Sequence, residues 1–343
     1  MYTSQDQIHL YAQESADDLP TALDPKTCLR RGFCPVPNPT RDPHQAYERK
    51  IYFELHGSEN PTHKMVFIMG LNNTCFSWSR QVEHFSKKPG HAVLVFDNRG
   101  VGYSSPGRLE LYKTSEMAKD ILELLNYIHW TQDRSLHIIG VSMGGMITQE
   151  LCFLIPNRVI SVTLTSTKAR DIHLPPLKVM LKIALMNLTG ANQAQRVSGL
   201  VKIMFPDHYL EAPAKTSDDQ FTTNQILEEA KMGYHHDIMR PQSSSAEVCQ
   251  TAAALFHSCS SESLNRLRKS LGNAKVMILT GDEDLLMSVS KSVELHQDLK
   301  DSELIVWKGG GHALCAQMEQ EYNSLIERVM KDGHDSIFNS THS

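Results

Sequence analysis

The sequence predicts an α/β fold in which a mostly parallel sheet is flanked by helices and carries an inserted helical cap. Short apolar runs of strand character alternate with stretches of helical period, as in sheets whose strands are joined by helices. Several runs are apolar at every position, which strands buried on both faces require. The alternation stops between about Ala169 and Glu262, where the apolar period becomes helical. We interpret this segment as the cap.

Seven strands are predicted, at residues 50–57, 64–70, 91–100, 135–142, 159–167, 275–284 and 303–312. A helical period follows Ser115, and another covers residues 288–299. In open sheets of parallel strands, ligands bind outside the carboxyl ends of the strands. We therefore expect the chemistry of this protein in residues that directly follow strands.

The amino-terminal region differs in composition from the rest of the chain. Six prolines lie between Leu19 and Pro43, so this stretch is predicted to be an extended arm rather than a packed element. The chain thus divides into an extended proline-rich arm at 1–47, a core at 48–168 and 266–333, and a helical cap at 169–265.

Composition and charge argue against several classes of partner. The 343 residues, of which 41% are hydrophobic, can bury a sizeable core, and the net charge of −5 is spread without long blocks of one sign. We therefore expect no nucleic-acid partner and no transmembrane segment. The first residues carry acids and lack the apolar run of a signal peptide. Seven scattered cysteines without a C-x-x-C pair favour reduced thiols, so we predict a cytoplasmic location.

The segment Gly140-Val-Ser142-Met-Gly144 has the pattern of a nucleophile's turn. It reads G-x-S-x-G directly after a predicted strand and directly before a helical pattern. Glycines are needed there because the serine backbone is strained and the helix passes close to neighbouring strands. A glycine-rich helix start with a capping serine is the structural alternative. We predict Ser142 as the nucleophile and the backbone N–H of Met143 as an oxyanion donor.

A serine hydroxyl is a weak nucleophile, so it needs a base, and the base needs an acid that orients it. Asp284 and His312 each follow a later predicted strand, which gives the chain order Ser, Asp, His. Each residue alone is ordinary, but three at strand ends in this order predict a catalytic triad. The competing acids are Asp282, Glu283 and Asp171.

A second oxyanion donor is expected from the loop after an earlier strand. That loop covers residues 69–73, and we choose the backbone N–H of Leu71, with Asn72 as the alternative. A side-chain amide of Asn72 or Asn73 would also serve. The structural alternative is a plain turn after a strand.

The remaining polar motifs predict no cofactor and no metal. The loop at residues 97–104 lacks the third glycine of G-x-G-x-x-G and has no G-K-[ST], so we interpret it as a tight loop pinned by its Asp and Arg. The run His235-His236-Asp237 has no partner at the spacing of metal ligands, and the chain contains no H-E-x-x-H.

Taken together, these motifs resemble the α/β-hydrolase superfamily, of the cap-bearing kind similar to small-molecule esterases and enol-lactonases. The resemblance covers about residues 50–330 and rests on Met69-Gly70, the loop at 97–104, the elbow at 140–145, Gly281 to Asp284, and Gly311-His312. It implies a serine esterase with a nucleophile elbow, an oxyanion hole and a triad. Met69 stands where this superfamily commonly has histidine. A serine at the elbow disfavours the activities of related epoxide hydrolases and dehalogenases, which use aspartate there.

We therefore predict hydrolysis of a carboxylic ester or lactone of a small, largely apolar substrate through an acyl-enzyme. The alternatives are a C–C bond hydrolase or an acyltransferase that uses the same triad. From a different class, a non-catalytic binding protein of this fold is also considered. The oligomeric state is left open.

The cap is predicted to contain an apolar helical stripe after Pro175-Pro176. Its members recur at helical spacing and are Leu177, Met180, Leu181, Ala184, Leu185 and Leu188. The stripe has three alternative interpretations: it packs on the core, it lines the substrate site, or it touches a membrane.

Overall fold

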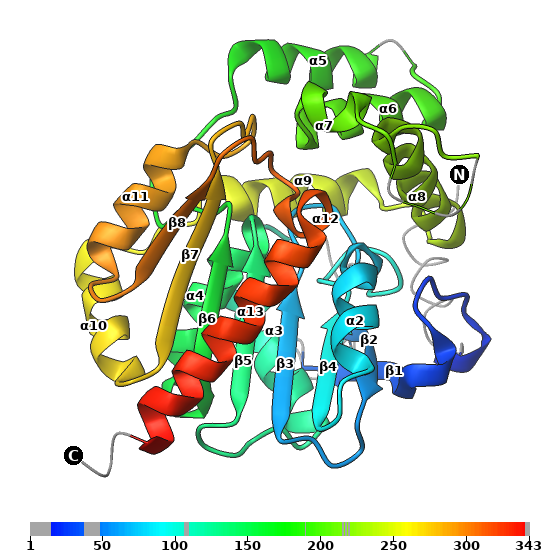
Figure 1. The fold of residues 1–343 in the computed structure, drawn as a ribbon. Coiled ribbons are helices and arrows are strands. Elements are labelled where there is room, and N and C mark those ends of the chain that lie inside the picture. The colour runs from blue at the N-terminus through cyan, green and yellow to red at the C-terminus, as the bar shows by residue number, and fades with distance from the viewer. Residues whose placement is uncertain are drawn as a thin grey trace.

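The computed structural model describes residues 15–37, 49–105, 110–188, 190–214, 216, 218 and 220–339. An eight-stranded sheet occupies the centre of the molecule, with helices on both of its faces (Figure 1). The predicted fold class, a mostly parallel α/β sheet flanked by helices, is confirmed.

The strands lie side by side in the order β1-β2-β4-β3-β5-β6-β7-β8. Their bounds are β1 Cys28–Val36, β2 Arg49–Gly57, β3 His63–Ile68, β4 His91–Phe96, β5 Leu136–Val141, β6 Val159–Thr165, β7 Lys275–Gly281 and β8 Glu303–Trp307. β2 pairs antiparallel with β1 and with β4, whereas all pairs from β4 to β8 are parallel. The carboxyl ends of β3 to β8 therefore lie along one edge of the sheet.

Helices join the parallel strands and cover the sheet. Within the described residues they are α2 Ser79–Ser86, α3 Thr114–Tyr127, α4 Met143–Leu154, α5 Leu177–Leu188, α6 Gln193–Met204, α7 Asp207–Glu211, α8 Asn224–Ile238, α9 Ser244–Leu255, α10 Ser261–Leu271, α11 Val289–Asp298, α12 Leu314–Gln317 and α13 Glu319–His334. Several begin at a capping side chain; Asn192, for example, accepts a hydrogen bond from the backbone N–H of Gln195 at the start of α6.

Apolar side chains fill both faces of the sheet. α3, α4, α10 and α11 cover one face, with residues such as Ile121 and Leu267, and α2 and α13 cover the other, with residues such as Phe85 and Tyr322. Figure 1 shows α2 and α13 in front of the sheet and α3 and α4 behind it. Every residue of β5 and β6 is buried, including the polar His137 of β5 and the serine and threonines of β6, so both faces of these central strands are covered.

The prediction for the amino-terminal arm is wrong in one respect. Residues 28–36 are extended, but they form the packed edge strand β1, in which Cys34 and Val36 are buried. An edge strand needs hydrogen bonds on only one side, so Pro35 is tolerated where a central strand would exclude it. The parts of the predicted arm at 1–14 and 38–47 lie outside the described residues.

Helices α5 to α10 lie between β6 and β7 in the chain. In Figure 1, α5, α6 and α7 lie beyond the carboxyl edge of the sheet. We keep the name cap for residues 169–265, a division that remains a proposal. Of the three interpretations of the apolar stripe on α5, packing on the core does not hold for its leucines, since Leu177, Leu181, Leu185 and Leu188 are 67%, 54%, 57% and 84% exposed.

Two further observations concern the chain as a whole. Across the described ranges, no helix combines the length with the apolar composition that crossing a bilayer requires. All seven cysteines lie within these ranges, and none of them forms a disulfide.

Candidate active site

Ser142 occupies a strained turn between β5 and α4. Its φ of 56° and ψ of −122° lie in a region that side chains other than glycine rarely adopt. A Cβ at Gly144 would collide with the carbonyl oxygen of Ile68 on β3, so only glycine lets α4 start this close to the sheet. The Thr167 hydroxyl donates to the Ser142 carbonyl at 2.7 Å and holds the turn. The predicted elbow geometry is therefore present.

Asp284 and His312 form a direct pair. The Nδ1 atom of His312 lies 2.8 Å from Oδ2 and 3.0 Å from Oδ1 of Asp284. The Asp284 carboxylate is fully buried and also accepts the backbone N–H groups of Leu286 and Met287 at 2.8 and 2.9 Å. These donors fix the carboxylate, which in turn fixes the orientation of the imidazole ring.

The competing acids have other partners. Asp282 accepts the backbone N–H of Gly309 at 2.7 Å, Glu283 lies 3.6 Å from Nδ1 of His208, and Asp171 lies 3.4 Å from Nζ of Lys291. Only Asp284 among these four carboxylates is hydrogen-bonded to His312 within the described residues.

The structure does not join Ser142 to His312 by a hydrogen bond. Among the described residues, neither Oγ of Ser142 nor Nε2 of His312 has a hydrogen-bond partner. Both residues follow strands of the parallel part of the sheet, whose pairing runs without a break from β5 to β8. Contacts between a nucleophile and its base are often long in ligand-free structures. Of the three residues of the predicted triad, Asp284 and His312 form a pair, and Ser142 lies at the same edge of the sheet.

Two backbone N–H groups near Ser142 are unpaired. Within the described residues, the N–H groups of Leu71 and Met143 donate to no protein acceptor. A Cβ at Gly70 would lie 3.8 Å from Oγ of Ser142, which places this loop beside the hydroxyl. The N–H of Asn72, by contrast, donates to Oε1 of Gln250 at 2.9 Å. This geometry favours Leu71 over Asn72 as the donor.

The side-chain amides considered as further donors serve the loop itself. Oδ1 of Asn72 accepts a hydrogen bond from Gln242 at 3.1 Å. Oδ1 of Asn73 accepts the Thr74 N–H at 2.9 Å and the Ser77 hydroxyl at 2.8 Å. These bonds hold the two amides through their oxygens and leave the Nδ2 groups as further potential donors beside the backbone N–H of Leu71.

Two cap residues make contacts with the site that the motifs do not predict. Gln250 on α9 is fully buried and donates to the Arg99 carbonyl at 3.0 Å as well as accepting the Asn72 N–H. The Met204 carbonyl at the end of α6 accepts the N–H of His312 at 2.9 Å. The packing of the cap creates these contacts, and such packing leaves no pattern in the sequence.

The loop at 97–104 is structural, as its composition indicates. Asp97 is fully buried and accepts the backbone N–H groups of Cys75 and Tyr103, each at 2.9 Å. Burial raises the pKa of Asp97 to about 6, although these two hydrogen bonds oppose the shift. Arg99 donates to the Asp120 carboxylate at 2.6 Å. Asp97 and Arg99 thus hold the loop that supports residues 69–75.

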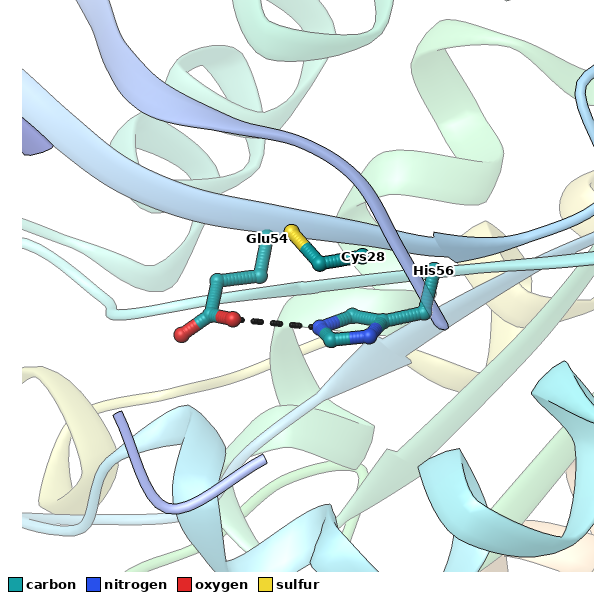
Figure 2. Close-up of side chains that lie close together, drawn as sticks. All are labelled: Cys28, Glu54 and His56. Carbon is teal, nitrogen blue, oxygen red and sulfur yellow. Dashed lines mark hydrogen bonds and ion pairs between the residues drawn. The ribbon is translucent and has the colours of Figure 1, made fainter. Parts of the chain in front are cut away.

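Two groups of side chains among the described residues have the composition and closeness to hold a metal ion: Cys28, Glu54 and His56 (Figure 2), and Glu150, His257 and Cys259. Neither group contains a residue predicted for catalysis. The run His235-His236-Asp237 is not among them, and Asp237 accepts a hydrogen bond from Gln193. The expectation that the reaction needs no cofactor or metal stays a prediction.

Comparison with known proteins places this geometry in context. The family model described as alpha/beta hydrolase fold matches residues 65–317. The putative carbamate hydrolase RutD of Rhizobium rhizogenes is 21% identical over 82% of this chain and 98% of its own length. The 3-oxoadipate enol-lactonase 2 of Acinetobacter baylyi is 24% identical over 78% of this chain and 88% of its own.

A solved structure extends the likeness to the fold. A thermophilic esterase from Thermogutta terrifontis superposes with a TM-score of 0.65, covering 89% of this chain and 99% of the esterase at 16% identity. At this level of identity the likeness concerns the fold alone.

Proposed function

Because this chain belongs to the α/β-hydrolase fold family, we propose that it is a serine hydrolase that cleaves a carboxylic ester or lactone of a small, largely apolar substrate. The observation that carries the proposal is the Asp284–His312 pair, at 2.8 Å, on the same edge of the sheet as the strained Ser142 turn. The carbamate hydrolase, enol-lactonase and esterase among the similar proteins support the reaction class.

In the proposed mechanism His312 removes the proton of the Ser142 hydroxyl as the oxygen attacks the substrate carbonyl. Asp284 keeps Nδ1 of His312 protonated, so that Nε2 is the basic nitrogen. The N–H groups of Leu71 and Met143 stabilise the oxyanion. His312 returns the proton to the leaving alcohol, and a water molecule, deprotonated by His312, then releases the acid from Ser142.

The apolar nature of the substrate is inferred from the surroundings of His312. Ala313, the next residue, is buried in a cluster with Val201 and Phe205 of the cap. Apolar cap side chains packed next to His312 favour apolar groups of a substrate over charged ones.

A substrate panel tests this function. The purified protein is assayed with short aryl esters, enol-lactones and vinylogous diketones, each with and without an added alcohol. We expect turnover of esters or lactones that is lost in Ser142→Ala. Diketone cleavage without ester turnover would instead support the C–C hydrolase, and a requirement for alcohol would support the acyltransferase. No turnover of any class by folded protein would favour a binding protein.

The seven unpaired cysteines support a reducing compartment, so a cytoplasmic location is part of the proposal.

A further inference from the structure

We propose that Cys28, Glu54 and His56 form a binding site for a divalent transition-metal ion of the zinc class (Figure 2). The ion would join β1 to β2 and would take no part in the reaction at Ser142.

The pairing of two strands brings the three side chains together. Cys28 on β1 lies opposite His56 on β2, and Glu54 is two residues away from His56 and so projects from the same face. Their potential ligand atoms all lie within 4.8 Å of one another. Glu54 and His56 are fully buried, whereas Cys28 is partly exposed and leaves a path from solvent.

The outer atoms of the two buried ligands are already held. Oε1 of Glu54 accepts the hydroxyls of Thr21 and Tyr52, both at 2.7 Å, so Oε2 remains for a ligand. Nδ1 of His56 lies 2.9 Å from Oγ1 of Thr27. Supporting hydrogen bonds of this kind orient the ligands in known metal sites.

The contacts of His56 show where the metal would sit. The Thr27 hydroxyl donates to the Asp24 carbonyl at 3.0 Å and lies 2.9 Å from Nδ1 of His56. On the other side of the ring, Nε2 of His56 and Oε2 of Glu54 face each other at 3.1 Å. A metal ion would bind between these two atoms.

The charges of the ligands match that of the ion. Bound as a thiolate, a carboxylate and a neutral imidazole, with any protons on the ligand atoms released to solvent, the three side chains would cancel the double positive charge of M²⁺. One sulfur, one nitrogen and one oxygen ligand suit Zn²⁺, with a fourth tetrahedral position for water.

Metal content and spectroscopy test the site directly. The full-length protein is stripped with a chelator, loaded with Zn²⁺ or Co²⁺, and desalted before elemental analysis. We expect about one ion per chain and, with Co²⁺, a thiolate-to-metal charge-transfer band. Cys28→Ser should abolish the band and lower metal retention at least tenfold. Cys34→Ala, on the same strand but outside the cluster, should change neither.

A second readout does not depend on any variant. The melting temperature of the wild-type protein should rise with added Zn²⁺ and return after chelation. Absence of metal retention by wild-type protein would overturn the proposal, as would equal retention by wild type and Cys28→Ser. Ester turnover is not part of this test, so it stays independent of the proposed function.

A different observation, on the cap, carries a second proposal: we infer that α5 docks on an anionic lipid surface. Leu177, Leu181, Leu185 and Leu188 recur on one side of this helix and are all more than half exposed. In Figure 1, α5 is the outermost helix beyond the carboxyl edge of the sheet. Adjacent exposed leucines on this scale mark an interaction surface.

The charge of the residues around α5 indicates that its partner is anionic. The segment from Leu177 to Met204 contains four basic residues and no acidic one, although the whole chain has a net charge of −5. Two of the basic residues, Lys178 and Lys182, lie on α5 beside the leucines. A second copy of the chain would bring lysines against lysines in a two-fold pair of α5 helices, whereas anionic headgroups neutralise them.

Vesicle sedimentation tests this surface. We expect binding to vesicles of phosphatidylcholine and phosphatidylserine, and at least tenfold weaker binding to pure phosphatidylcholine or at about 1 M salt. Leu181→Glu with Leu185→Glu should abolish binding, and Lys178→Gln should weaken it about fivefold. Leu154→Glu, at the opposite end of the sheet, is the control and should bind normally. If the double variant bound vesicles as well as the wild type, the proposal would be overturned. It would also be overturned if the wild type bound no vesicles and instead formed a dimer that the double substitution dissociates.

Discussion

Asp284–His312 and Glu54–His56 are two buried carboxylate–histidine pairs in the described part of the chain, and they differ in whether the second ring nitrogen has a partner. Asp284 and His312 meet at 2.8 Å, Glu54 and His56 at 3.1 Å, and all four side chains are buried or nearly so. Backbone N–H groups hold the Asp284 carboxylate, whereas side-chain hydroxyls hold that of Glu54. The main contrast is at the second ring nitrogen.

Within the described residues, Nε2 of His312 has no hydrogen-bond partner, whereas both ring nitrogens of His56 are engaged. A carboxylate orients an imidazole in both places, but only a histidine with a free second nitrogen can accept a proton from a nucleophile. The comparison therefore predicts that the first pair serves catalysis and the second serves structure.

The largest effect is expected from removal of each histidine. His312→Ala should lower kcat for an aryl ester by about a millionfold, the scale seen when a triad base is lost, with little change in melting temperature. His56→Ala should lower the melting temperature and leave the kcat of the remaining folded enzyme within about threefold of wild type. Steady-state kinetics and thermal melts on both variants make the check, and a reversed pattern would refute the assignment.

The second largest effect is expected from substitution of Asp284, the acid of the proposed catalytic pair. Asp284→Asn should lower kcat by about 10⁴-fold, because the asparagine favours the wrong tautomer of His312. The matched controls are Asp282→Asn and Asp171→Asn, whose carboxylates contact other partners. If either control lost as much activity as Asp284→Asn, the acid would have been misassigned.

A stability loss is predicted for the structural pair. Burial opposes ionisation of Glu54, but hydrogen bonds from His56, Tyr52 and Thr21 outweigh it and lower the pKa of this carboxyl below its ordinary value. Glu54→Gln, measured by urea unfolding in the presence of a chelator, should lose about 3 to 5 kcal/mol of unfolding free energy. The exposed Glu59→Gln serves as the control. A loss below about 1 kcal/mol would show that the pair is dispensable.

The smallest effect is expected from His137, a buried histidine without a carboxylate partner. It should appear as a loss of folding stability in acid. Burial, and then the nearby His63, lower the pKa of His137 from 6.5 to about 3. The unfolded chain then takes up the proton first, so stability is complete above about pH 6.5 and falls at lower pH. Between about pH 7.5 and 5.5 this group should remove about 1.4 kcal/mol of unfolding free energy. His137→Gln should flatten that slope, and an unchanged slope would assign the acid sensitivity elsewhere.

Patterns that reflect burial and close backbone approach could be predicted from the sequence. The run of β4 is apolar from Ala92 to Phe96 because both faces of the strand are covered, and Gly144 is required because α4 passes next to β3. Asp284 was chosen over Asp282 from strand-end position, and the pairing with His312 agrees with that choice.

Features set by long-range packing could not be predicted in this way. The prolines around β1 suggested a free arm, because the sequence does not show that an edge strand would tolerate them. Gln250 reaches the loop of Asn72 from 178 positions away. The leucines of α5 have the spacing of a core helix, and only the placement of α5 leaves them exposed. In each case the residue's neighbours in the folded structure, and not its neighbours in the sequence, determine its pairing or its exposure.

The most direct measurement is labelling with a serine-directed aryl phosphonate, followed by peptide mapping. We expect one label per chain, on Ser142, that is absent in Ser142→Ala, strongly slowed in His312→Ala and unchanged in His56→Ala. A label on another residue, or labelling of Ser142 that proceeds equally fast without His312, would contradict this expectation.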